Sequence, residues 1–458
     1  MTEELQNVYE KLLYFFEQRK FADLRMIILD MQPIDIARFI EDNIDKEQQT
    51  LFFRLLPKEL ASDVFVEFYT DTQEDLIKEF TDKELKAVID DMFLDDTVDI
   101  IEEMPANVVK RILKNTTVED RRKINELLAY PEDSAGSLMT PEFVTLSTSM
   151  TVEQAFNKIR RTGLKKETVY TCYITNNKKI LLGVITVKDL LMADNDEKIE
   201  DIMDTNFIYA ETHEDKEEVA LKFSTYDFIA MPVVDKEGCI VGIVTVDDAV
   251  DALQEEVTED IHKMSGMLPT EENYLHQSVF NVWKVRIPWL LILLISATFT
   301  GLILNIYEAR LNAISTVLFA CIPMLMGTGG NAGGQASATI IRSLALEEIE
   351  FKDIFKVIWK ELRASILLGI TLAVACFLKL LLIDNLLFGY SDYTNELCLV
   401  VSLTLFVTVI ISKLVGACLP LFAKLCHLDP AVMASPFITT MVDIISLLVF
   451  CTISVAML

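Results

Sequence analysis

The stretch IPMLMGTGGNAGGQ, residues 322–335, places glycines, a proline, and threonine, asparagine and glutamine inside a long apolar region. Gly-rich membrane helices usually mark faces where backbones approach closely, and Gly330 and Gly334 have that small-xxx-small spacing. This explanation does not cover the whole run, because Pro323 and the clustered glycines weaken a regular helix. We therefore expect irregular backbone here, whose exposed carbonyls, together with the Asn331 side-chain oxygen, suit the water shell of a cation.

Around this stretch the sequence predicts a membrane domain. A spanning helix needs roughly 20 apolar residues. Basic residues that precede the first apolar segment and follow the second and fourth predict a cytoplasmic N-terminus and, after five spans, a C-terminus outside. The five segments are approximately 287–307, 314–341, 364–383, 397–423 and 431–456.

The fifth segment contains one acid, Asp443, in PFITTMVDIISLLVF. A carboxylate at membrane depth is costly, so it is a functional candidate by default. One alternative is a structural ion pair with Lys413 of the fourth segment, although Lys413 and Lys379 lie near segment ends, where snorkelling is expected. In a symmetric dimer, two copies of Asp443 would meet at the two-fold axis and balance one divalent ion.

The charge distribution predicts a second, aqueous half. The chain has 458 residues, is 51% hydrophobic and has a formal net charge of −29. From Lys284 onward, 11 acidic and 11 basic residues cancel, so the first 283 residues hold 59 acids against 30 bases. This composition excludes an ordinary soluble enzyme, and the polyanionic half excludes a nucleic-acid binder. Of the 8 cysteines none forms a CxxC pair, which favours a reducing compartment and no zinc site.

Residues 1–130 show apolar residues at helical spacing in one short segment after another. Proline punctuation at Pro33, Pro57 and Pro105 separates the segments. Short amphipathic helices in this arrangement predict an acidic α-solenoid that stacks to bury its apolar stripes.

Residues 131–253 contain an internal repeat. SLMTPEFVTLSTSMTVEQAFNKI is echoed by DIMDTNFIYAETHEDKEEVALKF, and each unit is read as strand, helix, strand, turn, strand, helix. The pair resembles tandem CBS domains, a pseudo-symmetric α/β module with clefts between its halves. Both copies carry Gly-x-x-Thr-x-x-Asp, and in CBS families the hydroxyl and carboxylate of this motif often hold an adenosyl ribose. The simpler interpretation is that Thr and Asp cap the following helix. The residues concerned are Thr186 and Asp189 in the first copy, and Thr245 and Asp248 in the second.

Two acidic clusters predict a cation-dependent interface. One lies in the helical part, and the other follows the repeat on a long acidic helix, which continues into a connecting segment, residues 254–283. Carboxylates crowded in this way repel one another, so two such surfaces can pack together only with cations between them. Oxygen ligands without soft donors favour hard divalent ions. The clusters contain Asp90, Asp91, Asp95, Asp96, Asp99, Glu102 and Glu103, and Asp247, Asp248, Asp251, Glu255, Glu256, Glu259 and Asp260.

The order of these parts resembles the MgtE family of magnesium channels and transporters over essentially the full length. The matching stretches include YPEDSAGSLMTPEFV, TEDIHK, GTGGNAGGQ and DPAVMASPFITTMVD. The expected fold is therefore a multidomain membrane protein with a cytoplasmic α-solenoid, a tandem CBS pair, a connecting helix and a five-helix transmembrane domain from residue 284 to 458.

The resemblance implies a homodimer in the lipid bilayer of the cell membrane, with a pore on its two-fold axis lined by the second and fifth spans. It assigns the pore aspartate to Asp443 and the second-span signature to Asn331 with Gly327, Thr328 and Gly329, and it makes the Thr439 carbonyl a candidate second ligand. It further implies that Mg²⁺ is both substrate and regulator. The matching sensor positions are Asp95, Asp96, Asp99, Asp215, Glu217, Asp227, Asp248, Asp251, Glu256, Glu259 and Asp260.

The predicted function is a Mg²⁺ channel driven by the electrochemical gradient and closed by cytoplasmic Mg²⁺. No GxxxxGK[ST] motif is present, so coupling to ATP hydrolysis is not expected. ATP or another adenosine nucleotide is a candidate ligand of the CBS pair. The alternatives are transport of Co²⁺ or Mn²⁺, efflux or exchange, and a pore-less membrane-anchored nucleotide sensor.

Overall fold

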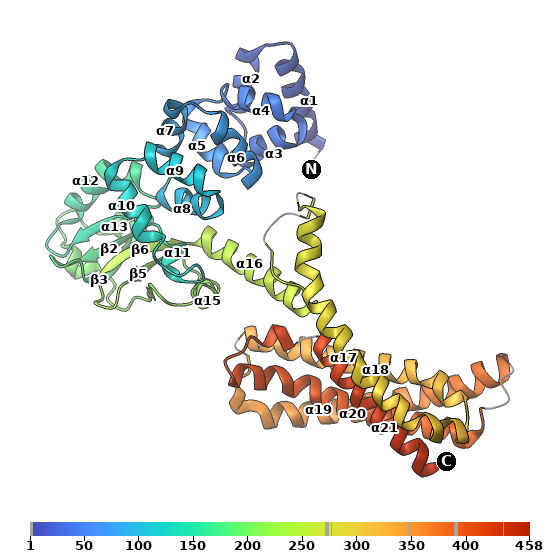
Figure 1. The fold of residues 1–458 in the computed structure, drawn as a ribbon. Helices are drawn as coiled ribbons and strands as arrows, with labels where there is room; N and C mark the ends of the chain where they lie inside the picture. Colours follow the sequence, from blue (N-terminus) through green and yellow to red (C-terminus); the bar gives the residue numbers. More distant parts are fainter. Residues whose placement is uncertain (1–2, 271–273, 276, 347, 389–392, 434) are drawn as a thin grey trace. The chain divides into compact units, whose positions relative to one another are not determined.

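The computed structural model describes residues 3–270, 274–275, 277–346, 348–388, 393–433 and 435–458. The chain divides into two compact units, Met1–Leu253 and Gln254–Leu458 (Figure 1). The expected connecting segment and the expected fifth span include residues 271–273, 276 and 434, which lie outside the described residues.

The first unit begins with short helices whose boundaries follow the local sequence. Pro33 is the first residue of α3, while Pro57 and Pro105 directly precede α5 and α9. Thr81 and Thr117 cap α7 and α10 by accepting backbone hydrogen bonds. The helices are α1 (Glu3–Glu17), α2 (Phe21–Ile28), α3 (Pro33–Asn43), α4 (Lys46–Phe53), α5 (Lys58–Val66), α6 (Thr70–Glu79), α7 (Asp82–Ile89), α8 (Leu94–Glu103), α9 (Ala106–Asn115) and α10 (Val118–Leu127).

The repeat forms two three-stranded sheets of the same topology. In each, the first strand pairs parallel with the second, and the second pairs antiparallel with the third. The first copy consists of α11 (Ala135–Leu138), β1 (Thr145–Ser147), α12 (Val152–Thr162), η1 (Gly163–Lys165), β2 (Thr171–Thr175), β3 (Leu181–Thr186) and α13 (Val187–Met192). The second consists of α14 (Ile199–Ile202), β4 (Ala210–Glu211), α15 (Lys216–Tyr226), β5 (Ala230–Val234), β6 (Ile240–Thr245) and α16 (Val246–Met264).

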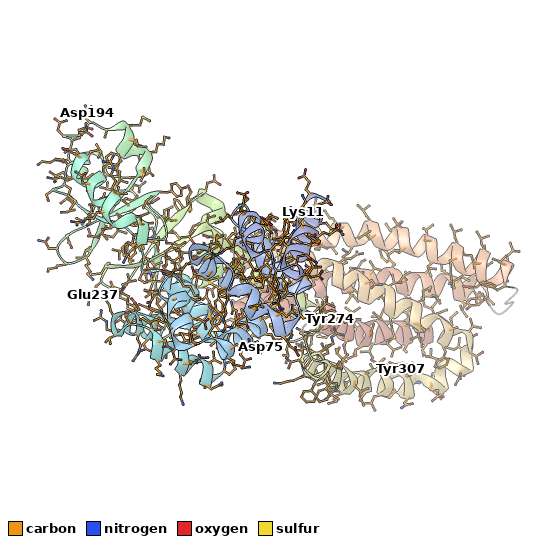
Figure 2. All side chains as sticks on the ribbon, turned by 90° about the horizontal axis from the view of Figure 1, so that it is seen from above. Lys11, Asp75, Asp194, Glu237, Tyr274 and Tyr307 are labelled. Atoms are coloured by element: carbon orange, nitrogen blue, oxygen red, sulfur yellow. The ribbon has the colours of Figure 1, made fainter. Side chains whose placement is uncertain are left out.

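The two copies are joined through their hairpin turns. The backbone N–H of Leu181 donates to the carbonyl of Gly238, and that of Ile240 donates to the carbonyl of Lys179, both at 3.1 Å. Figure 2 shows Asp194, which follows α13, and Glu237, in the β5–β6 turn, on different sides of this part.

One apolar core runs from the helical part into the second copy of the repeat. Buried residues of the helices, such as Phe39 and Ile101, belong to the same contiguous cluster as Met231 and Val244 of the β5–β6 sheet. Because this burial is continuous, the helical part and the repeat are held as one packed body.

The second unit contains the long apolar helices. Among its described residues, four helical segments are long and apolar enough to cross a membrane: Val279–Ile314, Phe351–Leu387, Asn395–Leu425 and Pro436–Met457. The first of these is α17 (Val279–Ile314). The second is built from three consecutive elements: η2 (Phe351–Asp353), α19 (Ile354–Lys379) and the π-helical η3 (Leu380–Leu387). The third is α20 (Asn395–Leu425), and the fourth is α21 (Ser435–Met457), which follows η4 (Pro430–Met433). A further helix, α18 (Val317–Ala345), has comparable length but is not among these four candidate spans.

The expectation of irregular backbone at residues 322–335 was wrong. Helix α18 continues without interruption through Pro323 and the glycines. The cause is packing: Gly329, Gly330 and Gly333 are buried against α20 and α21, and this contact outweighs their low helix propensity. The carbonyls of the run belong to the helix, so they are not the exposed ligands that the sequence suggested.

Candidate metal sites

The first candidate site is a group of carboxylates between α8 and the start of α16. Asp95 and Asp96 lie in the first turn of α8, where the helix dipole favours negative charge, and Asp99 follows one turn later. Asp247 and Asp248 occupy the first turn of α16. Glu167, between η1 and β2, acts electrostatically on Asp95. We call these six residues the acidic cluster.

Hydrogen bonds fix both sides of the acidic cluster. The Thr245 hydroxyl donates to Oδ2 of Asp248 at 2.5 Å, which orients that carboxylate at the end of β6. The backbone N–H of Leu94, at the start of α8, donates to Oε2 of Glu142 at 3.3 Å. Glu142 lies in the loop before β1, so this bond attaches α8 to the first copy of the repeat.

Burial and mutual repulsion raise the pKa values within the acidic cluster. Burial first, and then the charge of Asp248, raises the pKa of Asp96 to about 6 and that of Asp99 to about 8. Burial and the charges of Asp96 and Asp248 raise the pKa of Glu167 to about 7. Burial raises the pKa of Asp248 to about 6, against the hydrogen bond from Thr245. The arrangement therefore resists full ionisation unless positive charge is supplied.

Asp95 is the most extreme member of the acidic cluster. Burial, followed by the charges of Asp96 and Asp248, raises its pKa well above the usual range. Its Oδ1 atom and Oε2 of Glu167 are buried without a hydrogen-bond partner among the described residues. Orphaned buried carboxylate oxygens are costly in a native fold, and a hydrated divalent cation would satisfy them.

Within the described ranges, no group of three or more His, Cys, Asp or Glu side chains has the geometry of a ready metal site. Mg²⁺ dehydrates reluctantly and is usually held through one or two carboxylates and several waters. The acidic cluster therefore fits a hydrated ion better than one bound through a complete protein shell.

Several sequence-predicted sensor residues lie elsewhere. Asp251 lies one turn after Asp248 on α16; partial desolvation of its carboxylate and the charge of Asp247 raise its pKa. Asp215 caps the N-terminus of α15, and its Oδ1 accepts a 2.9 Å hydrogen bond from the backbone N–H of Glu217. Asp227 ends the same helix in the left-handed conformation, with φ 56°. Asp215, Glu217 and Asp227 are thus on α15 and its caps rather than on α8 or α16.

The remaining predicted sensors are on the part of α16 in the second unit, where Glu256 lies one turn before Asp260. Lys263 forms ion pairs with Glu259 and, at 2.6 Å, with Asp429 in the loop after α20. Burial and the charge of Asp429 raise the pKa of Asp260. This end of the connecting helix is therefore tied by charge to the segment that precedes α21.

The first Thr/Asp motif serves as a helix cap. The Thr186 hydroxyl accepts from the backbone N–H of Asp189, and the Asp189 carboxylate accepts from the N–H of Thr186, so the pair forms a capping box for α13. Thr245 and Asp248 lie at the equivalent junction of β6 and α16. Both motifs therefore have a structural role in the described fold, and ribose contact stays a prediction.

The second candidate site is Asp443 on α21. Its Oδ1 atom is buried without a hydrogen-bond partner among the described residues. Lys413, considered from sequence as its partner or as a snorkelling side chain, is instead buried and pairs with Glu361 of α19 at 3.9 Å. Lys379 likewise pairs with Asp384, at 2.6 Å. The snorkelling expectation was wrong for Lys413, because this lysine is buried with a carboxylate within reach inside the protein. The Lys379 side chain is exposed, so its snorkelling stays a prediction.

Glycines of α18 set the approach of α21. A Cβ atom on Gly330 would lie 2.9 Å from Cγ2 of Thr439, and one on Gly329 would lie 2.9 Å from Oγ of Ser446. Asp443 lies one helical turn beyond Thr439 and about one turn before Ser446, so it is close in depth to Gly329 and Gly330. A Cβ atom on Gly327, two residues before Gly329, would have no neighbour within 4 Å in the described part of the chain, so α18 has open space at that position.

The exposed face of α18 is polar. Gly327, Asn331 and Gln335 are exposed and spaced by four residues, so they share one face of the helix, while Thr328 is half-buried. Gly329 instead is buried and faces α20 and α21. Of the predicted second-span residues, the structure therefore places Gly327 and Asn331 on the free face, and Gly329 in the helix contact.

Comparison with known proteins gives the family. Residues 322–453 match the family model MgtE, described as a divalent cation transporter; residues 31–133 match the MgtE intracellular N domain, and residues 135–196 and 199–255 match CBS domains. A magnesium transporter MgtE from Thermus thermophilus is 34% identical over 435 residues, which cover 94% of each chain. This chain belongs to the MgtE family.

Two further MgtE proteins support the assignment. The magnesium transporter MgtE from Bacillus subtilis is 31% identical over 97% of this chain and 96% of its own length. A solved structure of the cytosolic domain of the Mg²⁺ channel MgtE in complex with ATP is 33% identical, with TM-score 0.51, and covers 53% of this chain and 99% of that one. The predicted fold class is confirmed, and the chain is a membrane protein of a transporter family.

Sequence reasoning did not identify Glu167 or Glu142 as neighbours of the acidic helices. Neither lies in an acidic run: Glu167 follows two lysines, and Glu142 follows a proline. Only the fold of the first CBS copy brings them to α8, so no local sequence signal would have indicated them.

Proposed function

We propose that this chain forms a Mg²⁺ channel, in which Mg²⁺ moves down its electrochemical gradient and closes the pore by binding on the cytoplasmic side. The observation that carries the proposal is Asp443, a carboxylate at membrane depth with an unpartnered buried oxygen. Such a residue is costly unless it interacts with an ion or water-filled path. The magnesium transporters and the Mg²⁺ channel to which the chain is similar support the choice of ion.

The pore is proposed to lie between two copies of the chain. The face of α18 with Gly327, Asn331 and Gln335 is polar and exposed, although α18 belongs to the membrane domain. Polar groups at membrane depth require a partner or a water-filled cavity. A homodimer in which α18 and α21 face the two-fold axis would supply both and would bring two Asp443 carboxylates to one hydrated ion. The Thr439 carbonyl remains a candidate second ligand.

The acidic cluster is proposed as the sensor of cytoplasmic Mg²⁺. Its carboxylates repel one another when the helical part lies against the CBS pair, so a divalent cation that binds there favours this docked arrangement. We propose that Asp251, Asp215, Glu217, Asp227, Glu256, Glu259 and Asp260 contribute further sensor positions, as the family resemblance implies. The N-terminal parts would then be cytoplasmic, and the C-terminus would lie outside.

A nucleotide role is a secondary proposal. The relative solved with ATP supports an adenosine nucleotide as a ligand of the CBS pair. In this chain the Thr186 and Asp189 capping box leaves the motif on the protein surface, since both side chains are exposed. We propose that a nucleotide there adjusts the response to Mg²⁺ rather than supplying energy for transport.

The experiment that tests the function is ion flux into proteoliposomes of the purified full-length protein. We expect Mg²⁺ uptake along an imposed gradient, reversal when the gradient is reversed, and weak competition by Co²⁺ and Mn²⁺. Equal transport of Co²⁺ would contradict Mg²⁺ selectivity, and movement against the gradient would indicate exchange or pumping. Nucleotide binding without any ion flux would favour a pore-less sensor.

A further inference from the structure

Helix α19 presents an exposed apolar face along the membrane domain. The helix lies in a candidate membrane span, Phe351–Leu387. Residues three or four positions apart share one face of a helix. Because the helix belongs to the membrane domain, exposed apolar side chains on one face are suited to contact with lipid chains. The side chains of this face that are each more than half exposed are Phe355, Trp359, Leu367, Ile370 and Val374.

One charged residue, Arg363, lies within this face. It follows Trp359 by four residues and precedes Leu367 by four, and its side chain is exposed. Residues 364–378, which come next, contain no charged side chain. Arg363 therefore lies where the apolar part of the span begins, at the level of the lipid headgroups. A guanidinium at this depth is costly unless it meets an anion or water.

Other basic side chains at the start of this span already have carboxylate partners. Lys352 forms an ion pair with Glu350 at 2.8 Å, and Lys356 forms one with Asp353 at 2.6 Å. These pairs neutralise the acids that precede Arg363 on the same segment. The lysines concerned are therefore not the groups that an added anion would neutralise.

Arg363 and Lys360 differ from these lysines. Among the residues that the structure describes, neither of them forms an ion pair. Glu361 lies between them in the sequence, but its side chain is turned inward and pairs with Lys413 of α20. Lys360 is exposed and three residues before Arg363, so the two cations are neighbours on the helix surface. Their positive charge is left without a compensating carboxylate in the described part of the chain.

Trp359 positions the guanidinium group of Arg363. Cζ of Arg363 lies 5.6 Å from the centroid of the Trp359 ring, and Nε donates to the Trp359 carbonyl oxygen at 3.3 Å. The two terminal nitrogens have no hydrogen-bond partner among the described residues. This planar fork matches a phosphate group, which accepts two parallel N–H bonds. Tryptophan rings also favour the headgroup level of a bilayer, so ring and guanidinium suit the same depth.

We infer that Arg363, Lys360 and Trp359 bind the headgroup of an anionic phospholipid. Arg363 holds the phosphodiester, Lys360 adds a second positive charge, and the acyl chains lie along the exposed apolar face of α19. An anionic headgroup is favoured over a zwitterionic one, because a lipid ammonium would be repelled by the two cations. The site requires only that α19 spans the membrane, so it stands apart from the proposed ion and the proposed gate.

The test uses Trp359 as a reporter of its own surroundings. The chain contains 3 tryptophans, so Trp283→Phe with Trp289→Phe leaves Trp359 as the single one. The full-length protein is placed in vesicles of phosphatidylcholine and phosphatidylglycerol, in which either lipid in turn carries dibrominated chains that quench tryptophan on contact. We expect phosphatidylglycerol to be preferred about fivefold or more, as for a basic side chain near anionic lipid.

Substitutions at the two cations test the site itself. Arg363→Gln should lower the preference for phosphatidylglycerol about fivefold, and Lys360→Gln should act in the same direction. Arg363→Lys keeps the charge but not the planar fork, so it should retain more of the preference than Arg363→Gln. Arg310→Gln is the matched control, because Arg310 is also exposed but lies near the end of α17, on the opposite side of the membrane from the start of α19. It should leave the preference unchanged.

Three results would overturn the site. One is equal quenching by the two brominated lipids before any change at Arg363 or Lys360. Another is a preference that survives both Arg363→Gln and Lys360→Gln, or that falls equally in Arg310→Gln. The third is loss of the preference on adding inorganic phosphate at matched ionic strength, which would indicate a soluble anion as the ligand. Mg²⁺ transport plays no part in this readout, so a failure of the proposed channel would leave the lipid site standing.

Discussion

In the acidic cluster six carboxylates crowd one place between α8 and α16, whereas α21 carries only one, Asp443. The cluster has partly accessible members and shifted pKa values near neutrality, so its charge responds to its surroundings. Asp443 instead lies on a helix held close to α18 by glycine contacts. The difference indicates that a group of many carboxylates suits a sensor that holds its ion. One carboxylate per chain suits a pore, because a transported ion must be able to leave it.

The largest effect is expected from Asp443→Asn. Removing this charge should reduce Mg²⁺ flux about a hundredfold, since an intramembrane charge interaction is worth on the order of 3 kcal/mol. Proteoliposome uptake measures the loss, and Asp443→Glu should recover part of the flux. Undiminished uptake in folded Asp443→Asn protein would show that this carboxylate does not line the path.

The double change Asp248→Asn and Asp251→Asn tests the sensor side. We expect the Mg²⁺ concentration for half-closure to rise about tenfold, because fewer carboxylates remain to hold the ion. Flux at low Mg²⁺ should be preserved. Asp196→Asn, at an exposed position outside the acidic cluster, is the control. An unchanged Mg²⁺ response in the double variant would place the sensor elsewhere.

The contact between α18 and α20 is tested by Gly416→Ala. A Cβ atom at Gly416 would overlap the carbonyl oxygen of Gly333, so α20 and α18 would have to separate. We expect a loss of about 1–3 kcal/mol in the free energy of unfolding, measured in detergent. Gly301→Ala is the matched control, because its Cβ would have no neighbour within 4 Å. Equal stability of the two variants would contradict the close packing.

The smallest effect concerns pH. Burial and mutual repulsion raise the pKa values of Asp96, Asp99, Glu167 and Asp248 to between about 6 and about 8 in the docked state. The docked state therefore takes up protons, so acidification favours it, and this contribution is lost as pH rises through these values. Without Mg²⁺, energy transfer between dyes on the helical part and the CBS pair should report more docking near pH 6 than near pH 8.

Glu167→Gln should weaken the pH dependence of docking, because it removes one of the titrating groups. An increase in docking with rising pH would contradict the assignment of these carboxylates to the interface.

The fold class could be predicted from the sequence because periodicity and repeats are local. Helical spacing in residues 1–130, the duplicated CBS pattern and the apolar segments each report one element at a time. The helical backbone of residues 322–335 could not be predicted from the sequence, because contacts of Gly329 and Gly333 with other helices decide its conformation. The same holds for Lys413: only the structure shows that Glu361 lies within its reach.

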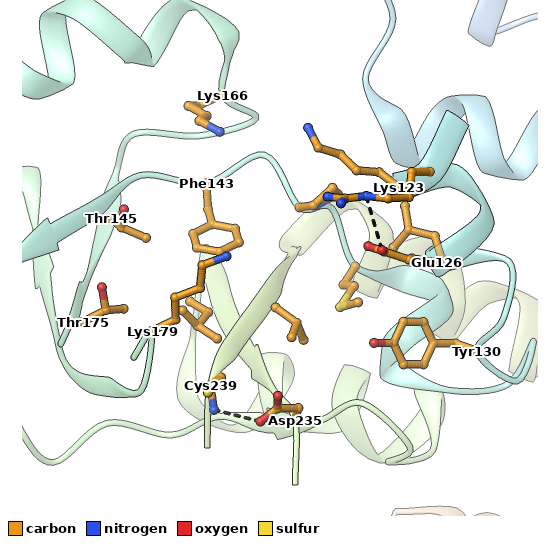
Figure 3. Close-up of a pocket in the computed structure, with 16 residues that line it drawn as sticks. Lys123, Glu126, Tyr130, Phe143, Thr145, Lys166, Thr175, Lys179, Asp235 and Cys239 are labelled. Carbon is orange, nitrogen blue, oxygen red and sulfur yellow. Dashed lines mark hydrogen bonds and ion pairs between the residues drawn. The ribbon is translucent and has the colours of Figure 1, made fainter. Parts of the chain in front are cut away.

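Sites built from distant segments were predicted in part. Acidic runs indicated Asp95, Asp96, Asp99 and Asp248, and the structure brings these together. Glu167 joins them only through the fold of the first CBS copy. A pocket whose lining includes Lys123, Lys166 and Lys179 (Figure 3) was not predicted, since these lysines lie in three separate segments with no common motif.

The most direct test of the central claim is Mg²⁺ flux through the unmodified protein in proteoliposomes, at low and at raised free Mg²⁺ on the side that bears the acidic cluster. We expect flux at low Mg²⁺ that stops when Mg²⁺ is raised on that side alone. Flux that continues unchanged at raised Mg²⁺ would contradict the claim that one ion is both the substrate of the pore and the ligand that closes it.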